Sequence, residues 1–195
     1  QITINNYFAS ANYQTLNKIT FDDGDWIIQG NLTLEGTDKN DKITGSQWND
    51  TINGGLGNDV IVDTLGDNEL NGGEGNDNIT GRGTLIGGTG NDTLTANVAG
   101  SSDTFIFDRG DGTDIINSID AAKVGEKGSD TLEIHGYNQA DMTTRRVGNN
   151  LVIILGGEGS GDQITINNYF ASANYQTLNT IVFDDQTWTI QGNLT

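Results

Sequence analysis

Three hexapeptides in this sequence combine residues that could bind a metal ion. They span residues 54–59, 72–77 and 87–92, and each reads Gly-Gly-x-Gly-x-Asp. The aspartate is followed each time by three residues with an aliphatic residue in the middle, so the full unit is nine residues long. A nine-residue pattern that recurs in this form is a specific signal of a repeat architecture.

The spacing of these residues favours a hard cation. Glycine at positions 1, 2 and 4 lets the chain turn tightly and aim its carbonyl oxygens inward, and the aspartate adds a carboxylate at the end of the turn. Oxygen ligands without sulfur or imidazole are those that Ca²⁺ selects. The central residue of the following triplet points inward from a short strand and needs neighbours to bury it. The pattern therefore predicts an all-β fold, a parallel β-roll (a β-helix) of stacked turns.

The charge of the chain agrees with a cationic partner. It has 27 acidic against 9 basic residues, a net charge of −18, and only 33% hydrophobic residues. Self-repulsion of this size opposes a compact state until cations neutralise it. Nucleic acid is excluded as a partner because phosphate binding needs clusters of Lys and Arg. The absence of cysteine excludes a disulfide framework, and no apolar run is long enough to insert into a membrane.

The two ends of the chain repeat each other. Residues 1–33 return as residues 163–195 with differences at only five positions, 18, 20, 24, 25 and 27. We expect a parent protein that repeats a module of about this size, joined to neighbouring modules of the same chain. The expected division is an N-terminal cap over 1–35, a roll over 36–117 and a C-terminal β capping domain over 118–195. Both caps are predicted to be antiparallel, and 1–33 is expected to fold onto the first ring.

Alternate turns should stack, because two nonapeptides complete one ring of the roll. We call the edge that collects the regular turns the first edge and the opposite one the second edge. The second edge is predicted to be eroded, since it ends its turns in Asp50, in Asn68, in a shortened turn at 81–83 and in a longer loop after Ala96. The turns of the first edge end in Asp41, Asp59, Asp77, Asp92 and Asp114. The predicted buried column is Ile43, Ile52, Ile61, Leu70, Ile79, Leu85, Leu94, Phe105 and Ile116.

These nonapeptides resemble the calcium-binding repeats of the RTX (repeats-in-toxin) family, and residues 103–114 and 130–190 resemble the regions that follow such repeats. The resemblance implies about four to five Ca²⁺ ions, each between two stacked turns. One turn would offer the carbonyls of positions 2 and 4, the next those of positions 1 and 3, and both their aspartates. The implied side-chain ligands are Asp41, Asp50, Asp59, Asp77, Asp92 and Asp114. The implied main-chain ligands are Gly54, Gly55, Leu56, Gly57, Gly72, Gly73, Glu74, Gly75, Gly87, Gly88, Thr89, Gly90, Gly110 and Gly112.

The resemblance also implies a function. RTX proteins are typically exported unfolded through type I secretion machinery and fold outside the cell, where calcium is abundant. The chain would then be a secreted or cell-surface module that assists folding and secretion and acts as a spacer in a larger toxin or adhesin.

Two other classes of function compete with this interpretation. A ligand-binding adhesin domain could use Tyr13, Trp48 or Tyr137 to contact a glycan or a surface, although core packing explains such aromatic residues better. An enzyme is not expected, because His135 is the only histidine and no nucleophile–base pair is recognisable. The neighbouring aspartates at 22–23 and 184–185 should face apart, as adjacent residues on a strand or turn do.

Overall fold

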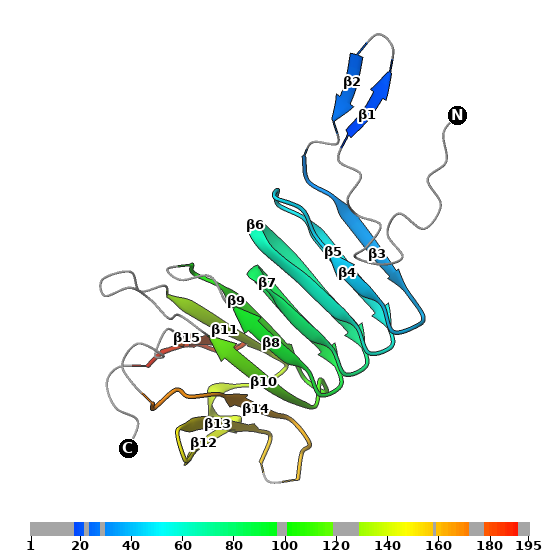
Figure 1. Ribbon diagram of the computed structural model, residues 1–195. Helices are drawn as coiled ribbons and strands as arrows, with labels where there is room; N and C mark the ends of the chain where they lie inside the picture. Colours follow the sequence, from blue (N-terminus) through cyan, green and yellow to red (C-terminus); the bar gives the residue numbers. More distant parts are fainter. Residues whose placement is uncertain are drawn as a thin grey trace.

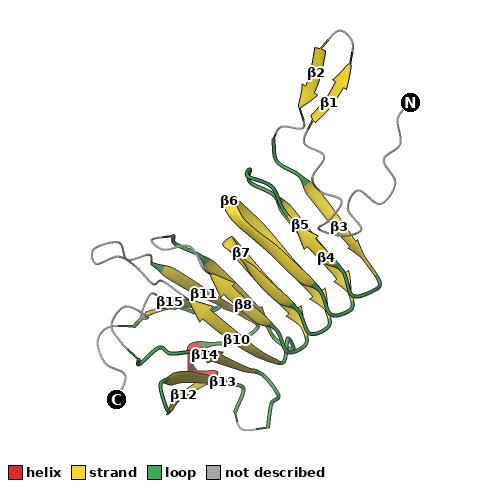
Figure 2. Ribbon diagram, viewed as in Figure 1, coloured by secondary structure: helices red, strands yellow, loops and turns green. Residues whose placement is uncertain are grey.

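The computed structural model is a β-roll that passes at its C-terminal end into a β cap (Figure 1). It describes residues 18–21, 24–27, 30–96, 101–118, 129–157, 159–171 and 178–190. Most of the expected N-terminal cap over 1–35 lies outside these residues. The all-β prediction is confirmed, since the only helix in the described part is the short 3₁₀ helix η2 (Gln139–Asp141), drawn in red in Figure 2.

The roll consists of two parallel stacks of strands that face each other. We call them stack A and stack B. The strands β6 and β7 each run from stack A around the second edge into stack B, which joins the two stacks into one hydrogen-bonded sheet. Stack A contains β4 (Lys42–Thr44), the first parts of β6 (Val60–Glu74) and β7 (Asn78–Thr89), β8 (Thr93–Ala96) and β10 (Thr113–Ser118). Stack B contains β3 (Thr33–Thr37), β5 (Thr51–Leu56), the second parts of β6 and β7, and β9 (Thr104–Asp108).

The predicted apolar column fills the space between the stacks as two facing rows, one from each stack. Each triplet after a turn contributes its middle residue, and parallel pairing in register places these residues on top of one another, as in the pairs Ile43↔Ile61 and Ile52↔Leu70. Every member of the predicted column is at most 1% exposed, and Leu34 extends the column by one residue towards the N-terminus. The stacking therefore buries completely what one nonapeptide could not bury alone.

The strands are longer than the predicted triplets. β6 spans 15 residues and β7 spans 12, so both include turn residues. The reason is that the turns also stack in parallel and exchange main-chain hydrogen bonds, for example from Gly57 N to Glu74 O at 2.8 Å and from Gly75 N to Thr89 O at 2.8 Å. The ladder thus continues around the corner of the roll.

The C-terminal cap continues both stacks before it becomes antiparallel. β14 (Gln163–Ile166) pairs in parallel with β10, and β11 (Asp130–His135) and then β15 (Leu178–Val182) extend stack B in parallel. The outer strands are antiparallel as predicted: β12 (Met142–Val147) and β13 (Asn150–Leu155) form a hairpin beside β14, and β16 (Thr187–Thr189) pairs with β15. The inner layer of the cap therefore differs from the prediction, because its strands bond to the open ends of two parallel stacks.

The repeated segment forms the same hairpin at both ends of the chain. β1 (Lys18–Phe21) and β2 (Gly24–Ile27) pair antiparallel, with Ile19 opposite Trp26. In β15 and β16, 162 residues later, Ile181 lies opposite Trp188. The register is identical, although three of the five sequence differences fall in β2. β15 has β11 as a second partner, whereas β1 and β2 form a separate two-stranded sheet.

None of the helices in the described part of the chain is long and apolar enough to cross a membrane.

Truncation of the apolar column should destabilise the roll strongly. Ile61 is completely buried in β6, and Ile61→Ala should lower the free energy of unfolding at saturating calcium by about 2–5 kcal/mol, because it leaves a cavity. The matched control is Val60→Ala, since Val60 is 37% exposed on the outer face of the same strand and should change stability by about 0.5 kcal/mol or less. Denaturant unfolding measures both. Equal losses for the two variants would contradict the assignment of the column.

Candidate calcium site

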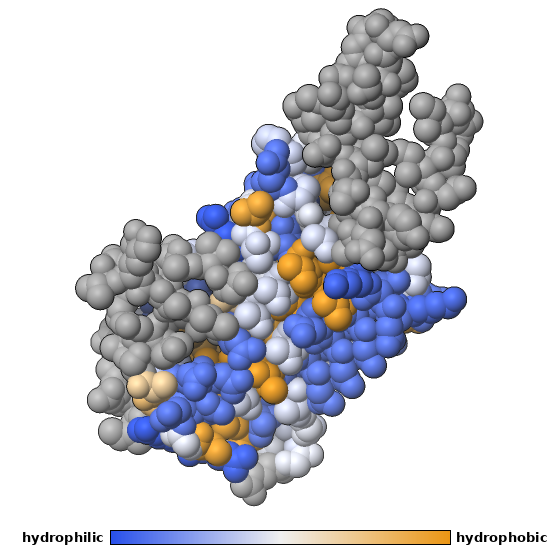
Figure 3. Space-filling view, in the orientation of Figure 1, coloured by the Kyte–Doolittle hydropathy of each residue, from blue (hydrophilic) through white to orange (hydrophobic). Residues whose placement is uncertain are grey.

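The aspartates of the first edge form a continuous hydrogen-bonded ladder. From Asp59 onward, each accepts a hydrogen bond through Oδ1 from the main-chain N–H of the aspartate in the preceding turn, so the predicted stacking is confirmed. The N···Oδ1 distances are 2.7 Å for Asp41–Asp59, Asp59–Asp77 and Asp77–Asp92, and 2.9 Å for Asp92–Asp114. Figure 3 shows the hydrophilic flank that these stacked turns form, at the lower right of the roll.

The second carboxylate oxygens in this ladder are the chemical core of the site. Oδ2 of Asp59, Asp77 and Asp92 is buried and has no hydrogen-bond partner, and each of these residues is at most 3% exposed. Burial and, as a smaller cause, the charge of the preceding aspartate raise the pKa of all three carboxyls, to about 7 for Asp92. A buried oxygen without a donor is costly unless a cation or a proton compensates it.

The glycines leave room for these oxygens. A Cβ atom added to Gly54 would collide with Asp59 Oδ2 and with the carbonyl oxygen of Gly72 in the next turn. A Cβ on Gly73, whose φ is +105°, would collide with the carbonyl oxygen of Gly55 in the preceding turn. The gap between two turns is therefore bordered by carbonyl oxygens from both sides and by a carboxylate, which is a ligand set that suits Ca²⁺.

A second ladder, which the sequence motifs did not predict, runs along the first edge. The asparagine at position 5 of each turn accepts a hydrogen bond through Oδ1 from the main-chain N–H of the position-5 residue in the following turn. The N···Oδ1 distances are 2.7–2.9 Å for the successive pairs Asn40–Asn58, Asn58–Asn76 and Asn76–Asn91. A signal for it was present, because all three regular hexapeptides carry Asn at this position. These amides hold successive turns in register beside the gaps.

The second edge is less eroded than predicted. Asp50 N donates to Asn68 Oδ1 at 2.9 Å, which repeats the first-edge link with an amide in place of the carboxylate. Further along, Gly83 N donates to Asp103 Oδ1 and Asp103 N donates to Asp130 Oδ1. Asp103 and Asp130 were absent from the predicted site, although each precedes a triplet with a large apolar centre, as Asp92 does. Burial raises the pKa of the Asp103 carboxyl, against the hydrogen bond from Ser101.

The last turn of the first edge departs from the pattern. A Cβ on Gly110 would meet nothing within 4 Å, so this predicted ligand residue does not pack against a stacked turn, whereas Gly112 is bridged to Gly90. Carboxylates gather here instead. Burial and, to a smaller extent, the charges of neighbouring carboxylates that include Asp162 raise the pKa of Asp114 to about 8 and of Asp111 to about 6.

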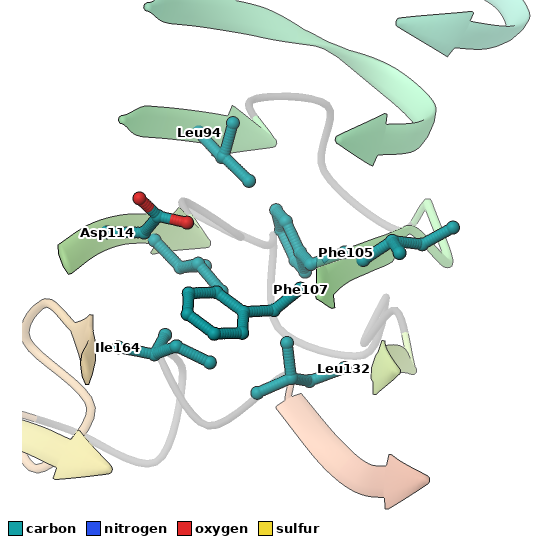
Figure 4. A pocket seen from close by; sticks show the side chains of 8 residues that line it. Leu94, Phe105, Phe107, Asp114, Leu132 and Ile164 are labelled. Atoms are coloured by element: carbon teal, nitrogen blue, oxygen red, sulfur yellow. The ribbon is translucent and has the colours of Figure 1, made fainter. Parts of the chain in front are cut away.

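An apolar pocket explains the strong shift at Asp114. The aspartate borders a pocket lined by Leu94, Phe105, Phe107, Leu132 and Ile164, which closes the roll against the cap and leaves no space for water (Figure 4). The carboxylate is 2% exposed. The pocket removes water from the ionised Asp114 carboxylate on this side. Its negative charge must therefore be compensated by a cation or a proton in the gap between the turns of Asp92 and Asp114.

The residues of the first edge fit calcium. Stacking places the predicted ligand residues of the turns at 36–41, 54–59, 72–77 and 87–92 along one edge. The gaps between these turns are lined by glycine and contain buried carboxylate oxygens without a hydrogen-bond partner. Among the described residues there is no cluster of three or more His, Cys, Asp or Glu side chains that could hold a metal ion alone. The ligand set that we propose for each gap therefore combines aspartates with main-chain carbonyls.

Comparison with known families agrees with this geometry. A model described as the RTX calcium-binding nonapeptide repeat matches residues 30–61 and 57–83. The chain is an RTX-family module. Residues 1–25 of the RTX module match a haemolysin-type calcium-binding protein related domain, and residues 112–194 match a BapA prefix-like domain. These are families of calcium-binding repeats and associated domains, and none of the three is a catalytic family.

Two solved structures are similar to the RTX module at low identity. Extracellular lipase LipA from Serratia marcescens is 17% identical with a TM-score of 0.38, and the match covers 72% of this chain and 38% of the lipase. The AlgE6R3 subunit of the Azotobacter vinelandii mannuronan C5-epimerase is 20% identical with a TM-score of 0.24, over 86% of this chain and 87% of that subunit. The module thus spans well under half the length of the lipase. No curated protein matches it significantly.

The RTX module without calcium should gain structure on acidification. The folded-state pKa is raised to about 7 at Asp92 and about 8 at Asp114, against about 3.9 for an unfolded aspartate. The folded state therefore binds more protons than the unfolded state between these values, so its stability is greatest below about pH 4 and falls as the pH rises to about 8. In calcium-depleted buffer, the β-sheet signal in circular dichroism should increase as the pH is lowered from about 8 to about 5.

The variant Asp114→Asn should weaken this dependence, because it removes the most shifted carboxyl while keeping an oxygen for Asp92 N. Asp67→Asn, which removes an exposed carboxylate, is the matched control and should leave the dependence unchanged. A β-sheet signal that grows with rising pH in the absence of calcium would contradict the expected direction.

Proposed function

We propose that this RTX module folds on exposure to extracellular calcium and serves as a folding, secretion-assisting and spacer unit of a larger type I secreted toxin or adhesin. The observation that carries the proposal is the ladder of buried aspartates with unpartnered Oδ2 atoms. In a chain with a net charge of −18, these oxygens oppose folding in the absence of a cation and hold the turns together in its presence.

The proposed ligands in each first-edge gap are the carbonyls of positions 2 and 4 of one turn, those of positions 1 and 3 of the next, and the two aspartates. Calcium would supply the positive charge that the site lacks. The residues themselves provide the rest: the position-6 N–H groups orient the carboxylates, and the position-5 amides keep the turns in register. About four ions would then lie along the edge, one for each gap between the turns that end in Asp41, Asp59, Asp77, Asp92 and Asp114.

The spacer role is supported by continuous pairing. Fourteen strands from β3 to β16 belong to one hydrogen-bonded sheet, so the calcium-loaded roll and its cap form one stiff unit. Export through type I secretion machinery suits a chain without disulfides that stays unfolded until it meets calcium. The BapA prefix-like match is in keeping with a secreted protein.

The aromatic residues considered for a ligand-binding adhesin domain differ in their exposure. Tyr137 is 3% exposed, because Arg109 lies over its ring at 3.9 Å and its hydroxyl donates to Asp162 Oδ2 at 2.6 Å. Trp48 is 40% exposed in a second-edge turn, and Tyr13 lies outside the described residues.

Calcium should drive folding. We expect a largely disordered chain in excess chelator and a β-rich chain in millimolar Ca²⁺, with a midpoint of roughly 10⁻⁴–10⁻³ M, as in other extracellular calcium modules. The transition should be cooperative, because each ion needs two turns that are already stacked. Circular dichroism during a calcium titration measures this. The same concentration of Mg²⁺ is the control and should induce little structure, since its strict octahedral geometry does not suit these gaps. Identical spectra in chelator and in calcium would sink the proposal.

Loss of one first-edge carboxylate should damage two sites. Asp77 lies between the gaps to the turns of Asp59 and Asp92, so Asp77→Asn should remove about two bound ions and raise the calcium midpoint several-fold. The asparagine keeps an oxygen for Asp59 N, which separates metal binding from the hydrogen-bonded ladder. Asp38→Asn, at an exposed position of the first turn, should leave ion count and midpoint unchanged. A calcium titration against a chromophoric chelator counts the ions, and an unchanged count for Asp77→Asn would contradict the shared-ligand arrangement.

A further inference from the structure

An unusual aspartate lies on the second edge. Asp63 occupies position 1 of the turn 63–68, where the regular turns have glycine. It is 2% exposed, and its Oδ2 atom is buried and has no hydrogen-bond partner. In the described part of the chain, four buried aspartate oxygens have no hydrogen-bond partner. Three belong to the first edge, and the fourth is Oδ2 of Asp63.

The Asp63 carboxylate stands where a ladder carboxylate would stand. At each regular turn, a Cβ on the first glycine would collide with Oδ2 of the aspartate that ends that turn, as at Gly54 and Asp59. At Gly45, the first glycine of the second edge, the colliding atom is Oδ2 of Asp63 from the next turn. Asp63 therefore brings a carboxylate oxygen into the gap between the turns 45–50 and 63–68.

Asn68 explains why this gap needs a substitute. Asn68 ends the turn with an amide, and its Nδ2 donates to the carbonyl oxygens of Asp63 at 3.2 Å and of Leu65 at 2.8 Å. These are the carbonyls of positions 1 and 3, which we propose as main-chain ligands in the gaps of the first edge. The usual carboxylate is thus missing, and the amide takes up two of the usual main-chain ligands.

Hydrogen bonds compensate the charge in this gap only in part: Asp50 accepts from Leu32 N, Ser46 N and the Ser46 hydroxyl. Asp50, also 2% exposed, lies close enough for its carboxylate to interact directly with that of Asp63. Burial and then the charge of Asp50 raise the pKa of Asp63 to about 7. Within the described residues, neither carboxylate pairs with a Lys or Arg side chain. Two adjacent buried carboxylates are unfavourable unless a cation or a shared proton lies between them.

We propose that Asp50 and Asp63 bind an additional Ca²⁺ ion between them, at a position shifted from the regular one by the Asn68 amide. Main-chain carbonyls of the turn 45–50 complete the ligand set; that of Trp48, for example, packs against Gly66 of the following turn. The proposal rests on the calcium-binding function proposed above. It differs from the regular sites because Asp63 lies at position 1, where the nonapeptide pattern has glycine and therefore no side-chain ligand.

The variant Asp63→Asn tests the site. It keeps the size of the side chain and removes one charge, and it should bind one ion fewer than the wild type in a calcium titration against a chromophoric chelator. Asp67→Asn is the matched control, because it removes an exposed charge from the same turn and should keep the wild-type count. An unchanged count for Asp63→Asn overturns the proposal and indicates a proton shared by the two carboxyls. A wild-type chain that binds no calcium would instead refute the proposed function as a whole.

Anomalous diffraction from wild-type crystals grown with Tb³⁺ in place of calcium provides a test that does not depend on how the variant folds. A peak within bonding distance of carboxylate oxygens from both Asp50 and Asp63 is expected. Peaks confined to the first edge would overturn the second-edge site while leaving the proposed function intact.

Discussion

Parallel stacking of identical turns places like charges directly above one another, and the rest of this structure depends on how that repulsion is compensated. The aspartates of the first edge cannot move apart without breaking the hydrogen bonds that link each N–H to the next Oδ1. Linked aspartates are 18, 18, 15 and 22 residues apart in sequence, yet they form the same bond. The short spacing arises at the shortened second-edge turn 81–83. The long spacing is shared between the loop after Ala96 and the first-edge segment 107–114. The hydrogen bonds between successive aspartates continue along the first edge through both irregularities.

The roll was predictable because its information is local and periodic. The position of Ile61 in the core follows from counting two residues beyond Asp59, and the same count applies at every regular turn. Asp103 and Asp130 lack the glycine frame that marks the regular turns, whereas their ladder bonds require only an aspartate before a stacked triplet. The role of Asp63 was not predictable, since it depends on the neighbouring turn at Gly45 and on the donors of Asn68. In the cap, the strands β11 and β13 were predictable from their apolar runs, but the parallel partner of β11 was not, because strand pairing is a non-local property.

Large aromatic side chains and hydrogen bonds to a carboxylate hold the junction between roll and cap together. Phe105 and Phe107 close the end of the apolar column. Asp162, from the strand entry of β14, accepts hydrogen bonds through Oδ2 from Gly110 N and from the Tyr137 hydroxyl, and so ties the last turn of the roll to the cap. Arg109, in the last turn of the roll, adds a positive charge over the Tyr137 ring. At this end of the first edge, hydrogen-bond donors of the protein therefore compensate negative charge in addition to any bound cation.

The identical register of the hairpins β1–β2 and β15–β16 has a consequence for how such a protein changes length. Residues 1–33 and 163–195 differ at only five positions, and their hairpins pair in the same register, so a genetic crossover between the two copies would keep the pairing within the hairpin. The product would gain or lose one whole period of 162 residues, with its roll and cap complete. A parent gene built from this unit could therefore vary the reach of its protein in fixed steps, while every calcium ladder within a unit stays intact.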